Sequence, residues 1–186
     1  MIINLIRHGK TSGNLVKRYI GKTDEPLCSE GIEELHNRSF PECDKLAVSP
    51  MKRCIQTAEL IYPSKKYIVC SDFRECDFGA FEGKNFHELS DDIRYSCWVE
   101  SGGRHDFPDG EKTCDFKNRC ISEFIRLTDG ICDSERLSLV VHGGTIMAVL
   151  ERFAVPHMNY FDWQTENGHG YITCFDRGKI TVLEKI

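Results

Sequence analysis

Short apolar runs alternate along the chain with longer segments in which apolar residues recur every three or four positions. The short runs have the length of buried strands, and the longer segments have the period of amphipathic helices. Expected strands cover 2–7, 45–49, 67–71, 137–142, 171–176 and 179–184, and expected helices begin near 12 and cover 51–62, parts of 85–100, 112–129 and 144–154. Strands that alternate with helices predict an α/β fold with three layers, a largely parallel sheet with helices on both faces.

The first apolar run leads directly into a cation and an imidazole. Ile2–Ile6 has the pattern of a buried strand, and Arg7, His8 and Gly9 follow it. Open α/β sheets bind ligands at the carboxyl ends of their strands, so both polar side chains are expected at such an edge. Gly9 allows a sharp turn and the close approach of a ligand. On the tripeptide alone a surface turn is the simpler interpretation, but the segments that follow favour a phosphate site with a histidine in attacking position.

A second unit of the same kind lies towards the other end of the chain. Leu139–Val141 is apolar, His142, Gly143 and Gly144 follow it, and an apolar helical run begins at Ile146. A lone histidine beside an apolar run is usually a buried core residue. Two histidines that each follow a strand and precede a helix indicate a shared function instead.

Two further segments contain candidate side chains. Ser49 and Pro50 suit the cap and the first turn of a helix, which places Arg53 near the positive end of that helix. Glu75 lies in a segment of carboxylates, aromatic residues and glycines, 73–83, that lacks a helical period and is typical of loops around pockets. The simpler alternatives are a solvated arginine on a helix face and an ordinary loop with a salt bridge.

Together these segments resemble the histidine phosphatase superfamily, whose members have the phosphoglycerate mutase-like fold. Positions 7–14 match its Arg-His-Gly-x-Thr-x-x-Asn signature, 26–31 its Leu-Thr-x-x-Gly segment, 49–58 its Ser-x-x-x-Arg-x-x-Gln-Thr-Ala segment, and 142–143 its second histidine. The resemblance covers nearly the whole chain. The chain departs from the family pattern where Lys10 replaces Glu or Gln, Cys28 replaces Thr or Ser, and Glu34 replaces Gln.

The resemblance implies a role for each of these residues. His8 is the nucleophile that accepts the phosphoryl group. Glu75 is the general acid, and Asp77 and Glu82 are the alternatives for that role. The phosphate oxygens are held by Arg7, Arg53 and His142, with Asn14 and the Gly143 amide nearby. Two arginines and two histidines supply the charge that Mg²⁺ supplies in other phosphoryl-transfer enzymes, so no metal and no other cofactor is expected.

Length and composition fit one domain that spans 1–186. The chain is 40% apolar, which is ordinary, and no repeat, low-complexity run or linker divides it. The net charge of −5 argues against nucleic acid as a partner. It still allows a small phosphomonoester as the substrate, because Arg7, Arg53 and Lys10 can form a local positive pocket.

The same composition bears on location and on cysteine chemistry. No apolar run reaches the roughly 18 residues of a membrane span, and the strand-like N-terminus does not resemble a signal peptide. The ten cysteines include no Cys-x-x-Cys pair, so they are interpreted as reduced thiols rather than as disulfides or metal ligands. A cytoplasmic protein without a membrane partner is expected. The oligomeric state is left open, with a homodimer among the alternatives.

The stretch 84–110 fits the alternation of strands and helices least. It contains Tyr95, Trp98 and Arg104, and a pair of glycines that allows it to flex. We interpret it as a cap over the site, with these three side chains as candidates for setting substrate choice. A peripheral helical excursion is the alternative.

Three functions compete for this site. The first is hydrolysis of a phosphomonoester, the second a cofactor-dependent phosphoglycerate mutase of the same fold, and the third non-catalytic binding of a phosphate ligand. The third is disfavoured because every core residue is present. The stretch between Glu75 and His142 is short, as in the phosphatase branch, whereas the mutases have a longer insert there. Within that branch, Trp98 and the segments 107–111 and 160–163 resemble the α-ribazole-5′-phosphate phosphatases of cobalamin synthesis.

Overall fold

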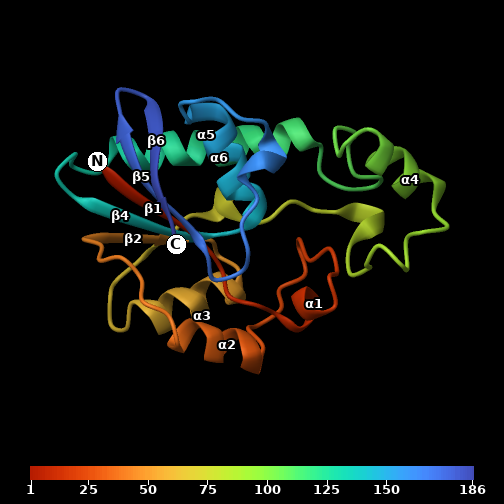
Figure 1. Ribbon diagram of the computed structural model, residues 1–186, viewed down its shortest axis with the longest axis horizontal. Helices are drawn as coiled ribbons and strands as arrows, with labels where there is room; N and C mark the ends of the chain where they lie inside the picture. The colour runs from red at the N-terminus through yellow and green to blue at the C-terminus, as the bar shows by residue number, and fades with distance from the viewer.

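A mixed sheet of six strands forms the centre of the molecule (Figure 1). The computed structural model describes all residues from 1 to 186. The strands are β1 (Ile2–Arg7), β2 (Lys45–Val48), β3 (Ile68–Val69), β4 (Arg136–Val141), β5 (Gly170–Asp176) and β6 (Lys179–Lys185). In the order β3-β2-β4-β1-β5-β6 the first four are parallel, and β5 is antiparallel to both of its neighbours. The largely parallel sheet predicted from the sequence is confirmed.

The register between β1 and β4 brings the two motif histidines together. Arg7 lies opposite Val141 in this parallel pair. The His8 amide then donates to the Val141 carbonyl at 3.0 Å, so the chain is still paired where β1 ends. His8 and His142 therefore follow neighbouring strands at the same edge of the sheet, where α/β folds bind ligands.

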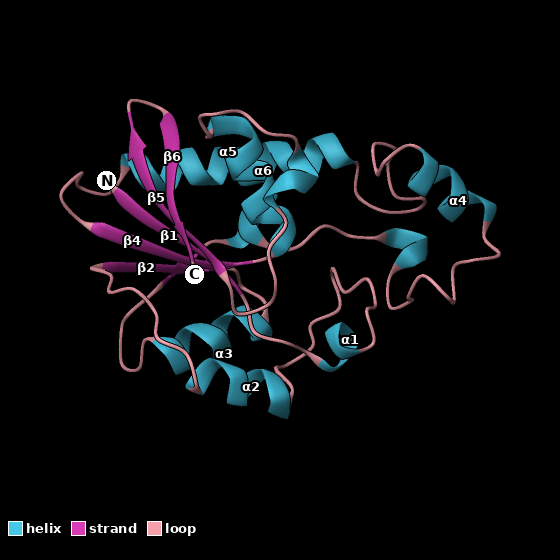
Figure 2. Cartoon of the chain, viewed as in Figure 1, coloured by secondary structure: helices cyan, strands magenta, loops and turns pink.

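Helices cover both faces of the sheet, as predicted (Figures 1 and 2). On one face lie α2 (Ser29–His36) and α3 (Lys52–Ile61), and on the other lie α5 (Thr113–Asp129) and α6 (Gly143–Phe153). Successive residues of β1 point to opposite faces. Leu5 packs in the apolar cluster that includes residues of α5 and α6, and Ile6 packs in the cluster that includes residues of α3. The burial of such side chains holds both helical layers against the sheet.

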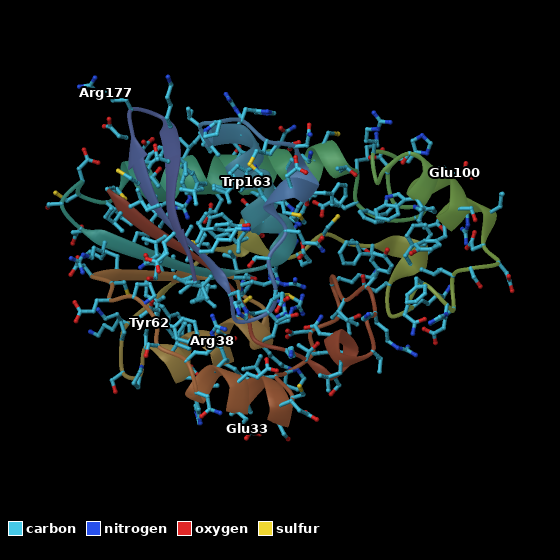
Figure 3. The ribbon with its side chains drawn as sticks, viewed as in Figure 1. Glu33, Arg38, Tyr62, Glu100, Trp163 and Arg177 are labelled. Atoms are coloured by element: carbon cyan, nitrogen blue, oxygen red, sulfur yellow. The ribbon has the colours of Figure 1, made fainter.

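The stretch 84–110 lies to one side of the sheet and its helices, at the right of Figure 1. Its helix α4 (Ile93–Glu100) has no buried residue, and Glu100 stands on its outer side (Figure 3). Aromatic rings connect this stretch to the rest of the molecule, with the ring centroids of Trp98 and Tyr19 6.0 Å apart. The remaining short elements are α1 (Ser12–Leu15) and the 3₁₀ helices η1 (Ser71–Phe73), η2 (Gly79–Phe81) and η3 (Tyr160–Trp163).

Several predicted elements shift by one residue at an end, and two differences affect the sheet or the site. The strand expected over 67–71 shortens to Ile68–Val69, because it is the outermost strand and about half of each of its side chains is exposed. The helix expected from 51 begins at Lys52, with Met51 as its N-cap. Ser49 therefore lies before the cap, and its hydroxyl has a different partner in the site.

Helix α2 was not predicted from the sequence. Its eight residues are mostly polar, and only Ile32 and Leu35 are large apolar side chains, too few to show a helical period. Its N-cap is Cys28, whose Sγ accepts the Gly31 amide at 3.4 Å where Ser or Thr would be usual. No helix in the structure is both long enough and apolar enough to cross a membrane.

Candidate active site

A cavity of about 380 Å³ opens at the carboxyl ends of β1 and β4. One part of its wall is polar and includes Arg7, His8 and Glu75. Another part is aromatic and consists of Tyr19, Phe78, Trp98, Phe107, Phe116, Tyr160 and Phe161. The cavity therefore combines charged groups that suit an anion with apolar surface that suits the remainder of a ligand.

His8 lies in the cavity wall and is 4% exposed. Its Nδ1–H donates to the Gly9 carbonyl at 2.7 Å, which leaves the lone pair of Nε2 free. The Gly9 amide donates to Thr57 Oγ1 at 2.9 Å and so holds this turn against α3. Burial, reinforced by the positive charges of Arg53 and Arg7, lowers the pKa of His8 well below its ordinary value. His8 is therefore neutral at pH 7, the form in which Nε2 is a nucleophile.

Two arginines lie close to His8, and backbone carbonyls rather than carboxylates hold their guanidinium groups. Arg7 Nη1 donates to the Thr165 carbonyl at 2.6 Å. Arg53 Nη1 and Nη2 donate to the carbonyls of Thr23 and Gly21, each at 2.8 Å. The Nε atoms of both arginines are buried without a partner. A carbonyl has no net charge, and neither guanidinium group forms an ion pair with a carboxylate, so both arginines favour an anion beside His8.

His142 lies next to His8, and their ring centroids are 5.2 Å apart. Ser49 Oγ accepts the Met51 amide at 3.4 Å and lies 2.7 Å from His142 Nε2, to which its own hydrogen can be donated. This bond replaces the helix cap that the sequence predicted for Ser49. Burial and the charge of Arg53 lower the pKa of His142 well below its ordinary value, so this ring is also neutral at pH 7.

The four residues of the expected phosphate pocket come together in two layers. Arg7 and His8 line the cavity, whereas Arg53 and His142 are completely buried and do not. A phosphate in the cavity therefore meets Arg7 and His8 first. It contacts Arg53 and His142 only if the floor of the cavity opens. The charge of Arg53 nevertheless acts on His8 through the protein.

Glu75 lines the cavity beside the N-terminus of α6. Its Oε1 accepts the Cys76 amide at 3.0 Å, and its Oε2 accepts the Gly144 amide at 3.3 Å. Burial raises the pKa of Glu75, although these amides and the charges of Arg53 and Arg7 favour the carboxylate. A carboxyl group with a raised pKa can carry the proton that a leaving alkoxide needs.

The two alternative acids have other partners. Asp77 accepts the Gly79 amide at 2.9 Å and lies 3.0 Å from Lys22 Nζ. Burial raises its pKa, but these two partners outweigh burial and lower the pKa overall. Glu82 accepts two backbone amides of the loop that follows α1. Neither side chain lines the cavity, so Glu75 is the carboxyl group that faces it.

Asn167 is part of the site and was not predicted from the sequence. Its Nδ2 donates to the His8 carbonyl at 3.1 Å and to Asn14 Oδ1 at 3.2 Å. Asn14 and Gly143, both expected near the phosphate, line the cavity as well. Asn167 lies in the loop between η3 and β5, where no apolar pattern or motif marks it, and only the fold brings it to His8.

Of the three residues expected to set substrate choice, only Trp98 lines the cavity. Tyr95 stacks on Trp98 with ring centroids 6.2 Å apart, and its hydroxyl is 3.2 Å from that of Tyr19. Arg104 is exposed, and its Nε donates to the Ser101 carbonyl at 2.7 Å. Of these three side chains, Trp98 is therefore the one that a ligand in the cavity can contact, and Tyr95 packs against the Trp98 ring.

All ten cysteines are free thiols in the structure. Cys54 Sγ lies 3.5 Å from His142 Nε2, and burial raises the pKa of Cys54 to about 12. Cys76 lines the cavity, and burial raises its pKa too. Both thiols are uncharged at pH 7, so neither offsets the positive charge of the arginines. No group of three or more His, Cys, Asp or Glu side chains is arranged to hold a metal ion.

Known proteins of one family match this chain over most of its length. The model of the histidine phosphatase superfamily (branch 1) matches residues 3–185. The adenosylcobalamin/alpha-ribazole phosphatase of Salmonella typhimurium is 26% identical over 174 residues, which cover 88% of this chain and 85% of the relative. A broad-specificity phosphatase of Saccharomyces cerevisiae is 30% identical over 164 residues, which cover 79% of this chain and 67% of the relative.

Solved structures share the fold over almost their full length. The alpha-ribazole phosphatase from Shigella flexneri superposes with a TM-score of 0.83 at 24% identity, covering 98% of this chain and 95% of the other. A phosphoglycerate mutase from Thermus thermophilus superposes with a TM-score of 0.76 at 27% identity, covering 100% and 98%. The same fold thus accompanies two different activities, and the fold alone does not choose between them.

Proposed function

The chain belongs to branch 1 of the histidine phosphatase superfamily, and on this basis we propose that it hydrolyses small phosphate monoesters through a phosphohistidine on His8. One observation carries the proposal. His8 is neutral with a free Nε2, and it lies beside two arginines, Arg7 and Arg53, that form no ion pair with a carboxylate. A nucleophile next to uncompensated positive charge is what phosphoryl transfer requires.

In the first step, Nε2 of His8 attacks the phosphorus, and the bond to the leaving oxygen breaks. Arg7 stabilises the negative charge on the equatorial oxygens, and Arg53 adds its charge from below. Glu75 gives its proton to the leaving oxygen, so the product departs as an alcohol and Glu75 becomes a carboxylate.

In the second step, a water molecule attacks the phosphohistidine. The Glu75 carboxylate accepts a proton from this water, and the bond between phosphorus and Nε2 breaks. Inorganic phosphate leaves, and both His8 and Glu75 return to their starting forms. Asn14 and the Gly143 amide serve in both steps as neutral hydrogen-bond donors to the phosphate, and His142 joins them if the floor of the cavity opens.

The proposed substrate has a leaving group that carries a planar heterocycle, as in α-ribazole-5′-phosphate. Aromatic side chains offer such a ring a stacking surface at little entropic cost, and they make up much of the cavity wall. Curated relatives at 26% and 29% identity are named for this substrate. The stretch 84–110 contributes Trp98, Gly103 and Phe107 to the wall, which supports its role as a cap within a single domain. The likeness to a phosphoglycerate mutase keeps a mutase as the alternative.

The proposal is tested by replacing the nucleophile. His8→Ala should remove nearly all turnover of phosphate monoesters, because no neighbouring group can accept the phosphoryl group in its place. Acid-labile phosphate trapped on the wild-type protein during turnover should be absent from the variant. The matched control is His157→Ala, which removes an exposed histidine and should leave turnover unchanged.

Two results would contradict the proposal. Wild-type turnover by His8→Ala would exclude the phosphohistidine. Efficient interconversion of 2- and 3-phosphoglycerate with a bisphosphoglycerate primer, without net release of phosphate, would assign the protein to the mutases.

A further inference from the structure

Gly144 connects Glu75 to a second side chain in the cavity wall. Gly144 is the second residue of α6, where the backbone amide has no acceptor within the helix. This amide donates to Glu75 Oε2 at 3.3 Å. The Gly144 carbonyl accepts the hydroxyl of Tyr160 at 3.3 Å, so one peptide segment links Tyr160 to the carboxyl group.

The absence of a side chain at Gly144 leaves the space in which Glu75 lies. A Cβ at this position would stand 2.4 Å from Glu75 Oε1 and 2.9 Å from Phe116 Cζ, whereas real Cβ atoms are essentially never closer than 3.0 Å to such neighbours. Phe116 is 1% exposed and packs with Cys120 and Ala148, so it has little room to move. The carboxyl group faces the cavity and is the group that would be displaced.

The other glycine of the motif differs in this respect. A Cβ at Gly143 would stand 3.4 Å from the Arg7 guanidinium, an ordinary contact distance. Of the two motif glycines, only Gly144 would therefore place a Cβ against the carboxyl group of Glu75.

Tyr160 is itself held in place on two sides. It lies in η3, and Lys117 Nζ from α5 sits 4.2 Å from the centre of its ring. Lys117 is in turn paired with Glu151 of α6 at 2.6 Å. Burial raises the pKa of Tyr160 well above its ordinary value, so the hydroxyl remains a donor at every working pH.

We propose that Gly144 and Tyr160 are positioning residues that hold the carboxyl group of Glu75 where it can protonate the leaving oxygen. Gly144 acts through the space it leaves and through its amide, and Tyr160 acts by fixing the Gly144 peptide. The inference rests on the proposed function, because it assigns residues that act through the proposed acid. General acid catalysis depends on sub-ångström placement of the donor, so a small displacement of the carboxyl group has a large effect.

The test uses two substrates that differ in their need for a proton. Gly144→Ala should lower kcat on an alkyl phosphate by about 100-fold, the lower range of a general acid contribution, with little change in KM. It should have far less effect on 4-nitrophenyl phosphate, whose leaving group scarcely needs a proton. Tyr160→Phe should show the same selectivity with a smaller loss of about 2- to 10-fold, as expected for one neutral hydrogen bond.

A double-mutant cycle with Glu75→Gln separates positioning from general damage. If Gly144 acts through Glu75, Gly144→Ala in the Glu75→Gln background should cause no further loss on the alkyl phosphate. Gly130→Ala is the matched glycine control, because a Cβ there would meet nothing closer than 3.6 Å. Tyr62→Phe is the matched tyrosine control, since it removes a hydroxyl bonded to the Pro41 carbonyl at 2.7 Å, away from the cavity.

The outcomes distinguish this inference from the proposed function. Equal losses on both esters, or losses that add to those of Glu75→Gln, would overturn the positioning role and leave the phosphatase intact. Unchanged turnover of the alkyl phosphate by Gly144→Ala would overturn it as well. A wild-type protein that releases no phosphate from either ester would contradict the proposed function itself.

Discussion

The environment of the two motif histidines determines which chemistry they can perform. Both rings are buried at the edge of the sheet, and positive charge lies beside each of them. Burial and the nearby arginines act in the same direction, because each disfavours a second positive charge. Neutral rings suit a nucleophile and a hydrogen-bond donor, whereas a protonated His8 would have no lone pair to attack phosphorus. The same feature makes the fold sensitive to acid.

We expect the free energy of unfolding to decrease as pH falls below about 6.5, the ordinary pKa of histidine in the unfolded chain. Below that pH the unfolded chain binds protons at these histidines and the folded protein does not, because the folded pKa values of His8 and His142 are lowered. Each histidine contributes a slope of up to about 1.4 kcal/mol per pH unit until its own folded pKa is reached. Glu75 has the opposite sign, because its raised pKa lets the folded protein keep a proton that the unfolded chain has lost.

Urea unfolding between pH 5 and pH 7.5 measures this dependence. His142→Gln should make the slope shallower by up to one proton. An identical slope for wild type and His142→Gln would show that His142 already titrates normally in the folded protein.

Among the elements, α4 contributes one side chain, Trp98, to the cavity wall. None of its residues is buried, so the helix is stabilised mainly through its aromatic side chains. The Trp98 ring meets Tyr19 edge-on at 6.0 Å and lies 5.3 Å from Phe107. Such a helix can change sequence without disturbing the sheet, which suits an element that determines specificity.

We expect Trp98→Ala to raise KM for α-ribazole-5′-phosphate by about 3- to 10-fold, the size of a lost aromatic contact, and to change kcat little. KM for 3-phosphoglycerate should hardly change, because this small substrate leaves the aromatic wall unused. Wild-type protein should accordingly show the higher kcat/KM on the heterocyclic ester. Val99→Ala, at an exposed position of the same helix, is the control.

Equal effects of Trp98→Ala on both substrates would show that Trp98 supports the cavity rather than the leaving group. A flat activity profile across monoesters would remove the named substrate and leave the class of reaction in place.

At the scale of the whole molecule, the net charge is negative while the charge around the site is positive. The chain has 29 acidic and 24 basic residues, and yet Arg7 and Arg53 meet no carboxylate partner beside His8. Net negative charge and a local positive site coexist because the field in a cleft depends on the nearest groups. A homodimer and a cytoplasmic location stay predictions.

We expect phosphate release to continue in excess chelator, because guanidinium groups supply the charge that a divalent cation supplies in other phosphoryl-transfer enzymes. The measurement is kcat/KM with and without EDTA, with a magnesium-dependent phosphatase in the same buffer as the control. Activity that disappears in EDTA and returns with Mg²⁺ or Zn²⁺ would contradict this account.

The sequence by itself determined the fold class, the two strand–histidine–glycine units and the family. These follow from local information, because the periods of strands and helices are set by near neighbours, and the motif residues directly follow the strands that position them. Since both strands are parallel, their ends had to meet at one edge of the sheet, and His8 and His142 do so. Helix α2 was not predicted, because its few apolar residues show no clear period.

Tertiary structure alone decided which side chains share hydrogen bonds and which reach the cavity. Ser49 was predicted as a helix cap and instead lies against His142, 93 positions away, because β2 and β4 are neighbours in the sheet. Asn167 meets His8, and Tyr160 meets Gly144, through loops without any local signal of their position. Contacts between distant segments depend on strand order and packing, and no periodicity within a short stretch of sequence encodes these.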